Sequence, residues 1–363
     1  MRPFSEIYNS YFSSTAVFSY RQDERIFRTR FKRVWFVIFL VLVAAALTGS
    51  TFGVGANEYH YFILNLILVN LIAAIGLSLL VGFTGLHAAF MGVGAYTSAI
   101  LITEYGCPFV LSILFAGFVA ALFGIIVGIP SLRIKGFYLM VATLAFQFVI
   151  DYLIIHWEGL TRGIRGIELP TPSLFGISLE TNQAFFTFLF VMAIIMMWGA
   201  KNLTRSKIGR AFVAIRDNDI SAEIIGIPIF PYKLLSFAIS AFYAGVAGAL
   251  YASLLRTAIP EDYVFLNSII LLAIVLIGGL GFLLGTVFGV IFITLIPVLL
   301  DLLVSYLAQV YDPNVTILLG PMKELVYGGL IILFIIFEPD GLVGIWIRIR
   351  EYFRIWPLPY ISE

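Results

Sequence analysis

The chain has 363 residues, of which 61% are hydrophobic and 12% are charged, and its mean hydropathy is +1.02. A soluble domain is typically about 45–50% apolar and about 25% charged, so this composition predicts an integral membrane protein. The net charge of +1 carries no nucleic-acid signal. A single cysteine, Cys107, excludes an internal disulfide and offers no metal cluster.

The N-terminal segment, residues 1–33, differs from the rest of the chain because it is aromatic, polar and basic. It lacks the short apolar core and small-residue cleavage site of a signal peptide, so we expect a cytoplasmic extension. Arg28, Arg30, Lys32 and Arg33 stand just before the first apolar stretch. Because basic residues collect on the cytoplasmic side of a membrane, this cluster predicts that the N-terminus lies inside.

Apolar segments recur along the remainder of the chain. A membrane span needs about 20 mostly apolar residues, and eight segments fit: 34–54, 60–81, 109–130, 137–157, 184–200, 233–255, 284–307 and 325–346. Two more, 87–103 and 265–281, are apolar but shorter or interrupted by Gly. Each of these two either crosses the membrane or re-enters from one side.

Charge distribution decides between crossing and re-entry. Basic residues collect at Arg133 and Lys135, over 201–216, and in the tail 347–363. If both ambiguous segments cross, every basic cluster and both termini fall on the cytoplasmic side. We therefore predict an all-α polytopic membrane protein with about ten transmembrane helices, formed by residues 34–346, with a cytoplasmic tail over 347–363.

Two Gly-rich stretches, 82–96 and 277–289, occupy comparable places in the two halves. Such paired interruptions can signal an internal repeat with a central substrate path, although close helix packing alone would account for them. The candidate pathway residues are Gly82, Gly85, His87, Phe90, Gly92, Gly94, Thr143, Gln147, Gly278, Gly279 and Gly281. Asp151 and Asp301 are charges within spans, and each is either a pathway contact or a residue near the headgroups.

The motifs of an enzyme are missing from the sequence. Its histidines, His60, His87 and His156, are scattered, and neither H-E-x-x-H nor G-x-S-x-G occurs. No Lys follows a Gly, so there is no Walker A loop. We expect a protein without catalytic or metal-binding residues and without a cofactor. If its transport is driven by ATP, the ATPase must be another polypeptide.

Two connections between spans stand out. The connection 158–183 is long, Gly/Pro-rich and predicted to be external, where it either contacts a partner or is an ordinary solvated loop. The connection 201–231 is predicted to be cytoplasmic and holds "GRAFVAIR", a short surface helix, then "ISAEIIG", a second one. Residues 217–219 supply N-caps and Gly226 a helix end, while Pro228 and Pro231 should delay the next span to Tyr232. This pair of helices is either a docking knob or an amphipathic element lying on the headgroups.

The stretch "GRAFVAIRDNDISAEIIGIPIFPYKLLSFAISAFYAGVAGALYA" closely resembles the cytoplasmic loop and following span of permease subunits of branched-chain amino-acid ABC importers. Further similar segments follow in the same order as in that family: "GVGAY", "LRIKGFYLMVATLAF", "WEGLTRGIRGI", "IGGLGFLLGTVFG" and "EPDGLVG". The resemblance covers roughly residues 60–346. Two departures are visible: "GFTGLHAAF" is about four residues shorter than the family pattern, and Arg162 and Arg165 replace residues that are often Gly and Asn.

The resemblance implies one membrane half of an importer in the bacterial inner membrane. Its implied partners are a second, related permease, two cytoplasmic ATPase subunits that bind ATP and dock on 209–227, and an extracytoplasmic binding protein that delivers a branched-chain amino acid. The implied docking residues are Arg210, Ala214, Arg216, Asp217, Asn218, Ser221, Ala222, Glu223 and Gly226. Three alternatives remain: a related permease for urea or short-chain amides, a stand-alone channel or secondary carrier, and a polytopic membrane enzyme.

Overall fold

The computed structural model describes residues 58–80, 87–131, 137–174, 176–310, 319–338 and 341–355. The expected N-terminal extension, the expected span 34–54, and both Gly82 and Gly85 lie outside these residues. The chain forms two compact units: residues 1–60 with 345–363, and residues 61–344. The second unit contains nearly all of the described residues and every feature discussed below.

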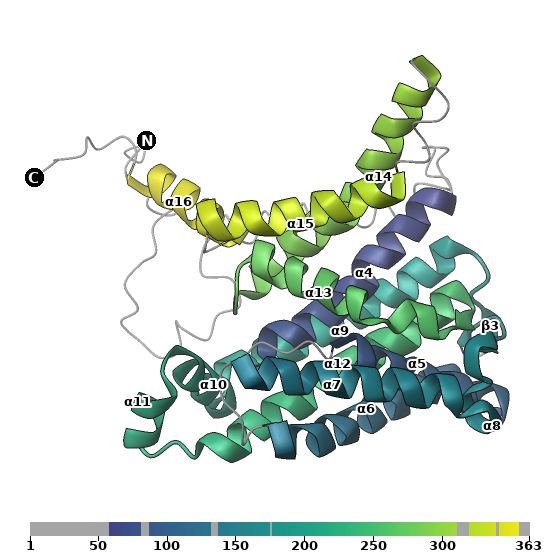
Figure 1. Ribbon diagram of the computed structural model, residues 1–363, viewed down its shortest axis with the longest axis horizontal. Helices are drawn as coiled ribbons and strands as arrows, with labels where there is room; N and C mark the ends of the chain where they lie inside the picture. The colour runs from purple at the N-terminus through teal and green to yellow at the C-terminus, as the bar shows by residue number, and fades with distance from the viewer. Residues whose placement is uncertain are drawn as a thin grey trace, which may run out of the picture. The chain divides into compact units, whose positions relative to one another are not determined.

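Helices make up most of the described residues (Figure 1). In chain order they are α4 (Glu58–Leu79), α5 (His87–Thr103), α6 (Phe109–Ser131), α7 (Phe137–His156), α8 (Glu158–Thr161), η1 (Gly163–Arg165), α9 (Asn182–Arg205), α10 (Lys207–Asp217), α11 (Asp219–Ile224), α12 (Ile229–Leu255), η2 (Pro260–Tyr263), α13 (Phe265–Gly278), α14 (Leu283–Val310), α15 (Leu319–Phe337) and α16 (Gly341–Ile355). The strands are short: β1 (Ile167–Glu168), β2 (Ser173–Leu174), β3 (Ile177–Ser178) and β4 (Thr257–Ala258).

Six helical segments in the described part of the chain are long and apolar enough to cross a membrane. They are Glu58–Leu79, Phe109–Pro130, Asn182–Arg205, Ile229–Leu255, Pro260–Gly278 and Leu283–Leu302. A seventh forms if Val141–His156 and Glu158–Arg165, which bend by 71° at their junction, are one span. The all-α polytopic membrane class is therefore confirmed, while ten crossings and a cytoplasmic position for both termini remain predictions.

Two predicted helix boundaries are wrong. The span expected over 325–346 is divided, because α15 ends at Phe337 and α16 begins at Gly341. Pro339 follows in the sequence and cannot donate a helical hydrogen bond, and the Gly341 φ of 66° is left-handed. The span expected from Tyr232 starts at Ile229 instead. Pro231 fits inside that first turn, because the first N–H groups of a helix have no intrahelical partner.

Small residues allow the central helices to pack closely. The long helix α12 packs against α5 and α6, which also contact each other, and α7 contacts both α5 and α6. Figure 1 shows these four helices running side by side. At the α5–α12 crossing, a Cβ added to Gly94 would overlap the backbone of Gly245. Close packing of this kind, with glycine at the contact, is typical of helices in a membrane.

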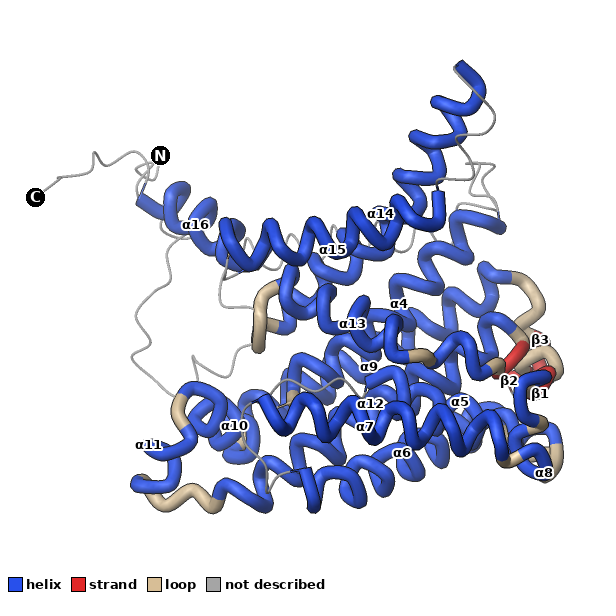
Figure 2. The backbone as a smooth tube through the Cα atoms, viewed as in Figure 1, coloured by secondary structure: helices blue, strands red, loops and turns tan. Residues whose placement is uncertain are grey.

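A second group of helices, α13, α14 and α15, packs pairwise and meets the first group where α13 contacts α5 and α7. The two short sheets lie near α8 at one end of the unit, and α10 and α11 lie at the other (Figure 2). β1 pairs with β4 in antiparallel register, with Ile167 opposite Ala258. The Arg256 side chain also donates a hydrogen bond to the Glu180 carbonyl at 2.9 Å. The connection 158–183, which is predicted to be external, is therefore joined to residues 256–258 on one side of the protein.

Candidate functional site

The connection predicted as a docking element folds into two short helices, α10 and α11. Ser206 ends α9 and caps α10, because its Oγ accepts a hydrogen bond from the Gly209 N–H at 3.3 Å. Gly209 lies directly on the end of α9, where a Cβ would overlap the Leu203 carbonyl and the Thr204 Cα. The first docking helix is thereby fixed against the span that precedes it.

The second docking helix has a cap at each end. Asn218 accepts a hydrogen bond from the Ser221 N–H at 3.0 Å, so it is the N-cap among the three polar residues predicted for that role. At the other end the Ile227 N–H bonds to the Ala222 carbonyl at 3.0 Å and the Gly226 N–H to the Glu223 carbonyl at 2.9 Å. These two bonds, with a Gly226 φ of 85°, form a Schellman motif. The prediction of two separate short helices ending at Gly226 is confirmed.

A small core holds the two helices together. Phe212, Ile215 and Ala222 are buried, and residues from α9 and the start of α12 pack around them. The Phe212 and Tyr232 rings meet edge to face with centroids 6.5 Å apart. Lys233 on α12 also forms an ion pair with Asp219, with Nζ and Oδ2 3.6 Å apart. The α10–α11 unit is therefore a folded element attached to α12, which begins directly after it.

The outer face of α11 exposes apolar side chains beside carboxylates. Ile220, Ile224 and Ile225 are 65%, 80% and 71% exposed, and both Glu223 and Asp217, the last residue of α10, are also exposed. We call these five residues the α11 surface. An exposed apolar patch rimmed by charge is typical of an interaction site, and sequence reasoning had not selected the isoleucines. The isoleucines are visible in the sequence "ISAEIIG". The structure adds that Ala222 packs into the small core, whereas the isoleucines stay exposed.

The residues predicted for docking divide into two groups. Arg210, Asp217, Ser221 and Glu223 are exposed, and their side chains have no part in the caps or core of α11 described above. Asn218, Ala222 and Gly226 shape α11 through its caps and core, and Ala214 is partly buried against that core.

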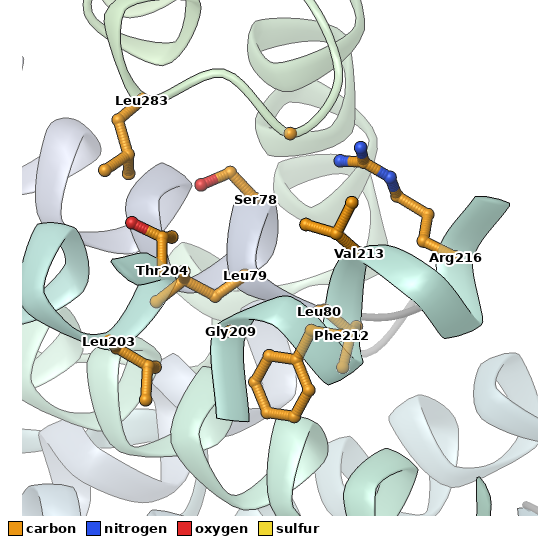
Figure 3. A pocket seen from close by; sticks show the side chains of 11 residues that line it. Ser78, Leu79, Leu80, Leu203, Thr204, Gly209, Phe212, Val213, Arg216 and Leu283 are labelled. Atoms are coloured by element: carbon orange, nitrogen blue, oxygen red, sulfur yellow. The ribbon is translucent and has the colours of Figure 1, made fainter. Parts of the chain in front are cut away.

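Arg216 points to a different place. Arg216 and Val213 project from α10 toward Ser78, near the end of α4, and they line a pocket of about 40 Å³ (Figure 3). Gly281, in the turn between α13 and α14, lines the same pocket. A water needs roughly 10–15 Å³ by this kind of measure, so the pocket has room for a few waters and is too small for an amino acid.

The second group of predicted residues meets at the beginning of α5. The first N–H groups of a helix lack intrahelical partners, and in a membrane they must find partners within the protein. Here the Ala88 N–H donates to Ser268 Oγ on α13 and the Ala89 N–H donates to Gln147 Oε1 on α7, both at 2.9 Å. Gln147 Nε2 donates to the Tyr263 carbonyl at 3.0 Å and to Asp151 Oδ1 at 2.9 Å.

We call the contacts among Ala88, Ala89, Gln147 and Ser268 the α5 junction. His87 and Phe90 are buried beside it, and His87 Nε2 lies 2.8 Å from the Ala73 carbonyl. Thr143, one turn before Gln147 on α7, is also buried. Gly92 lies against Tyr263, since a Cβ there would stand 3.1 Å from the Tyr263 Cβ. The structure therefore brings these pathway candidates together, and it shows them as packed and hydrogen-bonded groups.

The remaining pathway candidates lie at the other end of α13. A Cβ on Gly278 would overlap the Gly285 backbone, so α13 and α14 touch there. Gly279 ends α13 with a φ of 112°, and Gly281 follows with a φ of 76°. Of the two acids predicted within spans, Asp151 bonds to Gln147 and Asp301 lies within α14. No group of His, Cys, Asp or Glu among the described residues is arranged to hold a metal ion.

Comparison with known proteins follows this geometry. Residues 59–335 match the family described as branched-chain amino acid transport system / permease component. The chain is 32% identical over 309 residues to the high-affinity branched-chain amino acid transport system permease protein LivM of Escherichia coli (strain K12), covering 77% of this chain and 69% of the relative. It is 25% identical to the probable branched-chain amino acid transport permease protein LivM of Methanocaldococcus jannaschii, covering 64% of this chain and 68% of the relative.

A more distant relative transports a different kind of solute, according to its name. The chain is 29% identical to the autoinducer 2 import system permease protein LsrC of Enterobacter sp. (strain 638), covering 60% of this chain and 61% of the relative. No solved structure matches the chain significantly.

Proposed function

Because this chain belongs to the permease family of branched-chain amino acid transport systems, we propose that it is one transmembrane half of an ATP-driven importer of branched-chain amino acids. Its partners are a second permease of the same family, two ATPase subunits in the cytoplasm and a solute-binding protein outside. The membrane is the bacterial inner membrane, with ten crossings, both termini inside and the permease domain over 34–346. ATP is bound by the partner subunits, and this chain needs no cofactor.

The α11 surface is the observation that carries the proposal. It combines three exposed isoleucines with two carboxylates on an element that has its own core and both helix caps. Such an element moves as a body when a partner pushes on it, because its shape does not depend on that partner. Since α12 begins five residues after α11 ends, a push on the α11 surface reaches α12 through a short connection.

The opposite end of the protein suits a partner outside the membrane. Arg162, Ile164 and Arg165 are exposed on the η1 turn beside α8, and Arg162 has a left-handed φ of 60°. Two cations on a short, rigid turn favour an acidic face on the arriving protein, because complementary charge guides encounter and orientation. We assign this η1 turn to contact with the binding protein.

The docking role is tested with variants that leave the fold unchanged. Asp217→Ala combined with Glu223→Ala removes both carboxylates, and Ile224→Ser removes an anchor that is 80% exposed in the free chain. In each variant we expect ATPase subunits to co-purify at least about tenfold more weakly, which corresponds to about 1.4 kcal/mol, and ATP-dependent uptake to fall with them. Asp217→Glu with Glu223→Asp keeps both charges and is the matched control.

A role for the α11 surface at the membrane, in place of docking, predicts different results. If the α11 surface lies on lipid headgroups instead, Ile224→Ser leaves capture of the ATPase subunits unchanged. Wild-type capture and wild-type uptake in the double alanine variant would overturn the docking assignment. The solute is identified by measuring what the cognate binding protein binds, and retention of leucine, isoleucine or valine over urea and short-chain amides is the expected result.

A further inference from the structure

Arg216 contacts a part of the protein that lies far away in the sequence. A Cβ added to Gly281 would overlap the Arg216 guanidinium, so this side chain rests directly on the backbone of the turn between α13 and α14. The side chain is 39% exposed, and its ε-nitrogen lies 3.5 Å from the Asp217 carboxylate. An exposed pair at that distance contributes little. The contact with the turn is thus the feature that sets Arg216 apart from Asp217 and Glu223.

The turn that Arg216 touches is bonded to both of its helices. The Gly279 N–H donates to the Val275 carbonyl on α13 at 3.0 Å, and the Thr286 N–H of α14 donates to the Phe282 carbonyl at 3.0 Å. Gly281 has a φ of 76°, a conformation that most side chains disfavour. A displacement of this turn is therefore passed to α13 and α14 and is not absorbed by a loose loop.

The hairpin of α13 and α14 has little room to yield next to the turn. Gly278 and Gly285 touch through their backbones, and a Cβ on Gly289 would overlap the Ile274 carbonyl. Gly341, at the start of α16, lies against the same end of α13, where its Cβ would stand 2.7 Å from the Ile277 carbonyl. Backbone-to-backbone packing has no side-chain rotamers to rearrange, so the hairpin moves as one body.

The other end of α13 reaches the α5 junction. Ser268 is the fourth residue of α13, and its Oγ accepts the hydrogen bond from the Ala88 N–H. A helix of 14 residues is about 21 Å long. One rigid helix therefore connects the Arg216 contact beside the docking helices with the first turn of α5, next to the middle of α7.

We propose that Arg216 is a positioning residue that transmits movement of the α10–α11 unit to α13, and through α13 to the α5 junction. This inference rests on the docking function proposed above, and it gives that function a second route besides the direct connection to α12. Arginine and lysine differ at this place, because the planar guanidinium lies against the backbone turn in a fixed geometry, whereas lysine is a flexible point charge.

The test separates docking from transmission. Arg216→Gln is compared with Lys207→Gln, which removes a positive charge from an exposed position on the same helix. Both variants should capture the ATPase subunits as well as the wild type. Arg216→Gln should then transport at least about tenfold less solute for each ATP hydrolysed, within the usual range of coupling between sites, while Lys207→Gln should remain coupled. Arg216→Lys should be intermediate.

A double-mutant cycle tests whether the contact itself is responsible. Gly281→Asn adds a side chain at the contact, and Asn tolerates a positive φ better than most residues do. If Arg216 and Gly281 act through one contact, Arg216→Ala with Gly281→Asn should be no more uncoupled than the worse single variant. Multiplying effects would mean that the two residues act independently and would overturn the inference.

Failure of this inference looks different from failure of the docking proposal. Wild-type coupling in Arg216→Gln, or loss of ATPase capture in that variant, contradicts a transmitting role for Arg216. The docking proposal fails if the Asp217 and Glu223 double alanine variant still captures the ATPase subunits and transports normally. Membrane levels of each variant are measured by immunoblot, so that uptake is always compared at equal amounts of protein.

Discussion

Replacing Gln147 by leucine should destabilise the protein far more than an ordinary polar-to-apolar change within a span. The substitution keeps the side-chain size but leaves the Ala89 N–H without its acceptor and takes a donor from the Tyr263 carbonyl. A buried backbone group left unpaired costs about 1–3 kcal/mol, and an interhelical hydrogen bond in a membrane protein averages about 0.6 kcal/mol. The expected loss in unfolding free energy is therefore about 2–4 kcal/mol.

The assay is reversible unfolding in mixed detergent micelles, with Asn70→Leu as the matched control. Asn70 Nδ2 donates to the Thr294 hydroxyl at 3.4 Å, so that substitution breaks one long hydrogen bond between side chains and leaves no backbone group unpaired. Its expected cost is about 0.6 kcal/mol. Equal losses for Gln147→Leu and Asn70→Leu would refute the reasoning, because the first turn of α5 would then not depend on Gln147.

Three further predictions follow from the packing, the caps and the charges. Gly94→Ala should lower the unfolding free energy by about 1–3 kcal/mol through overpacking of α5 on α12. Gly159→Ala, whose added Cβ meets nothing within 4 Å, should leave the unfolding free energy nearly unchanged. Equal effects of the two substitutions would contradict the close approach of α5 and α12. Asn218→Ala should lower the stability of α11 by about 0.5–2 kcal/mol, which is measured as faster amide hydrogen exchange in α11 but not in α12. Unchanged exchange in α11 would contradict the capping role of Asn218. Arg162→Glu with Arg165→Glu should reduce stimulation of ATP hydrolysis by the binding protein, most strongly at low salt. Wild-type stimulation in this double variant would contradict contact between the η1 turn and the binding protein.

The docking helices could be predicted from sequence because their signals are local. Asn218 lies at the N-terminus of α11 and Gly226 just beyond its C-terminus, and both act on groups within five residues of themselves. Polar residues in a largely apolar chain are also easy to see. The missed start of α12 shows the limit of such signals, because Pro231 is a helix breaker by composition but is tolerated in a first turn.

The rest of the site depends on contacts between distant segments. Gln147 and Ser268 both serve the first turn of α5, yet they are 121 residues apart, and no local pattern pairs them. The resemblance placed Arg216 and Asp217 together as docking residues, but α10 turns the Arg216 side chain toward Gly281. Likewise, the hydropathy of 325–346 showed one apolar segment, whereas the structure divides it between α15 and α16.

Uptake of labelled leucine into proteoliposomes tests the central claim most directly. The vesicles contain this chain with its partner permease and ATPase subunits, and the binding protein is added at the face that carries the η1 turn. Saturable uptake should require ATP, and the double variant Asp217→Ala with Glu223→Ala should lose it at equal protein. Leucine uptake that continues without the ATPase subunits, or that is unaffected by the double variant, would contradict an importer driven through the α11 surface.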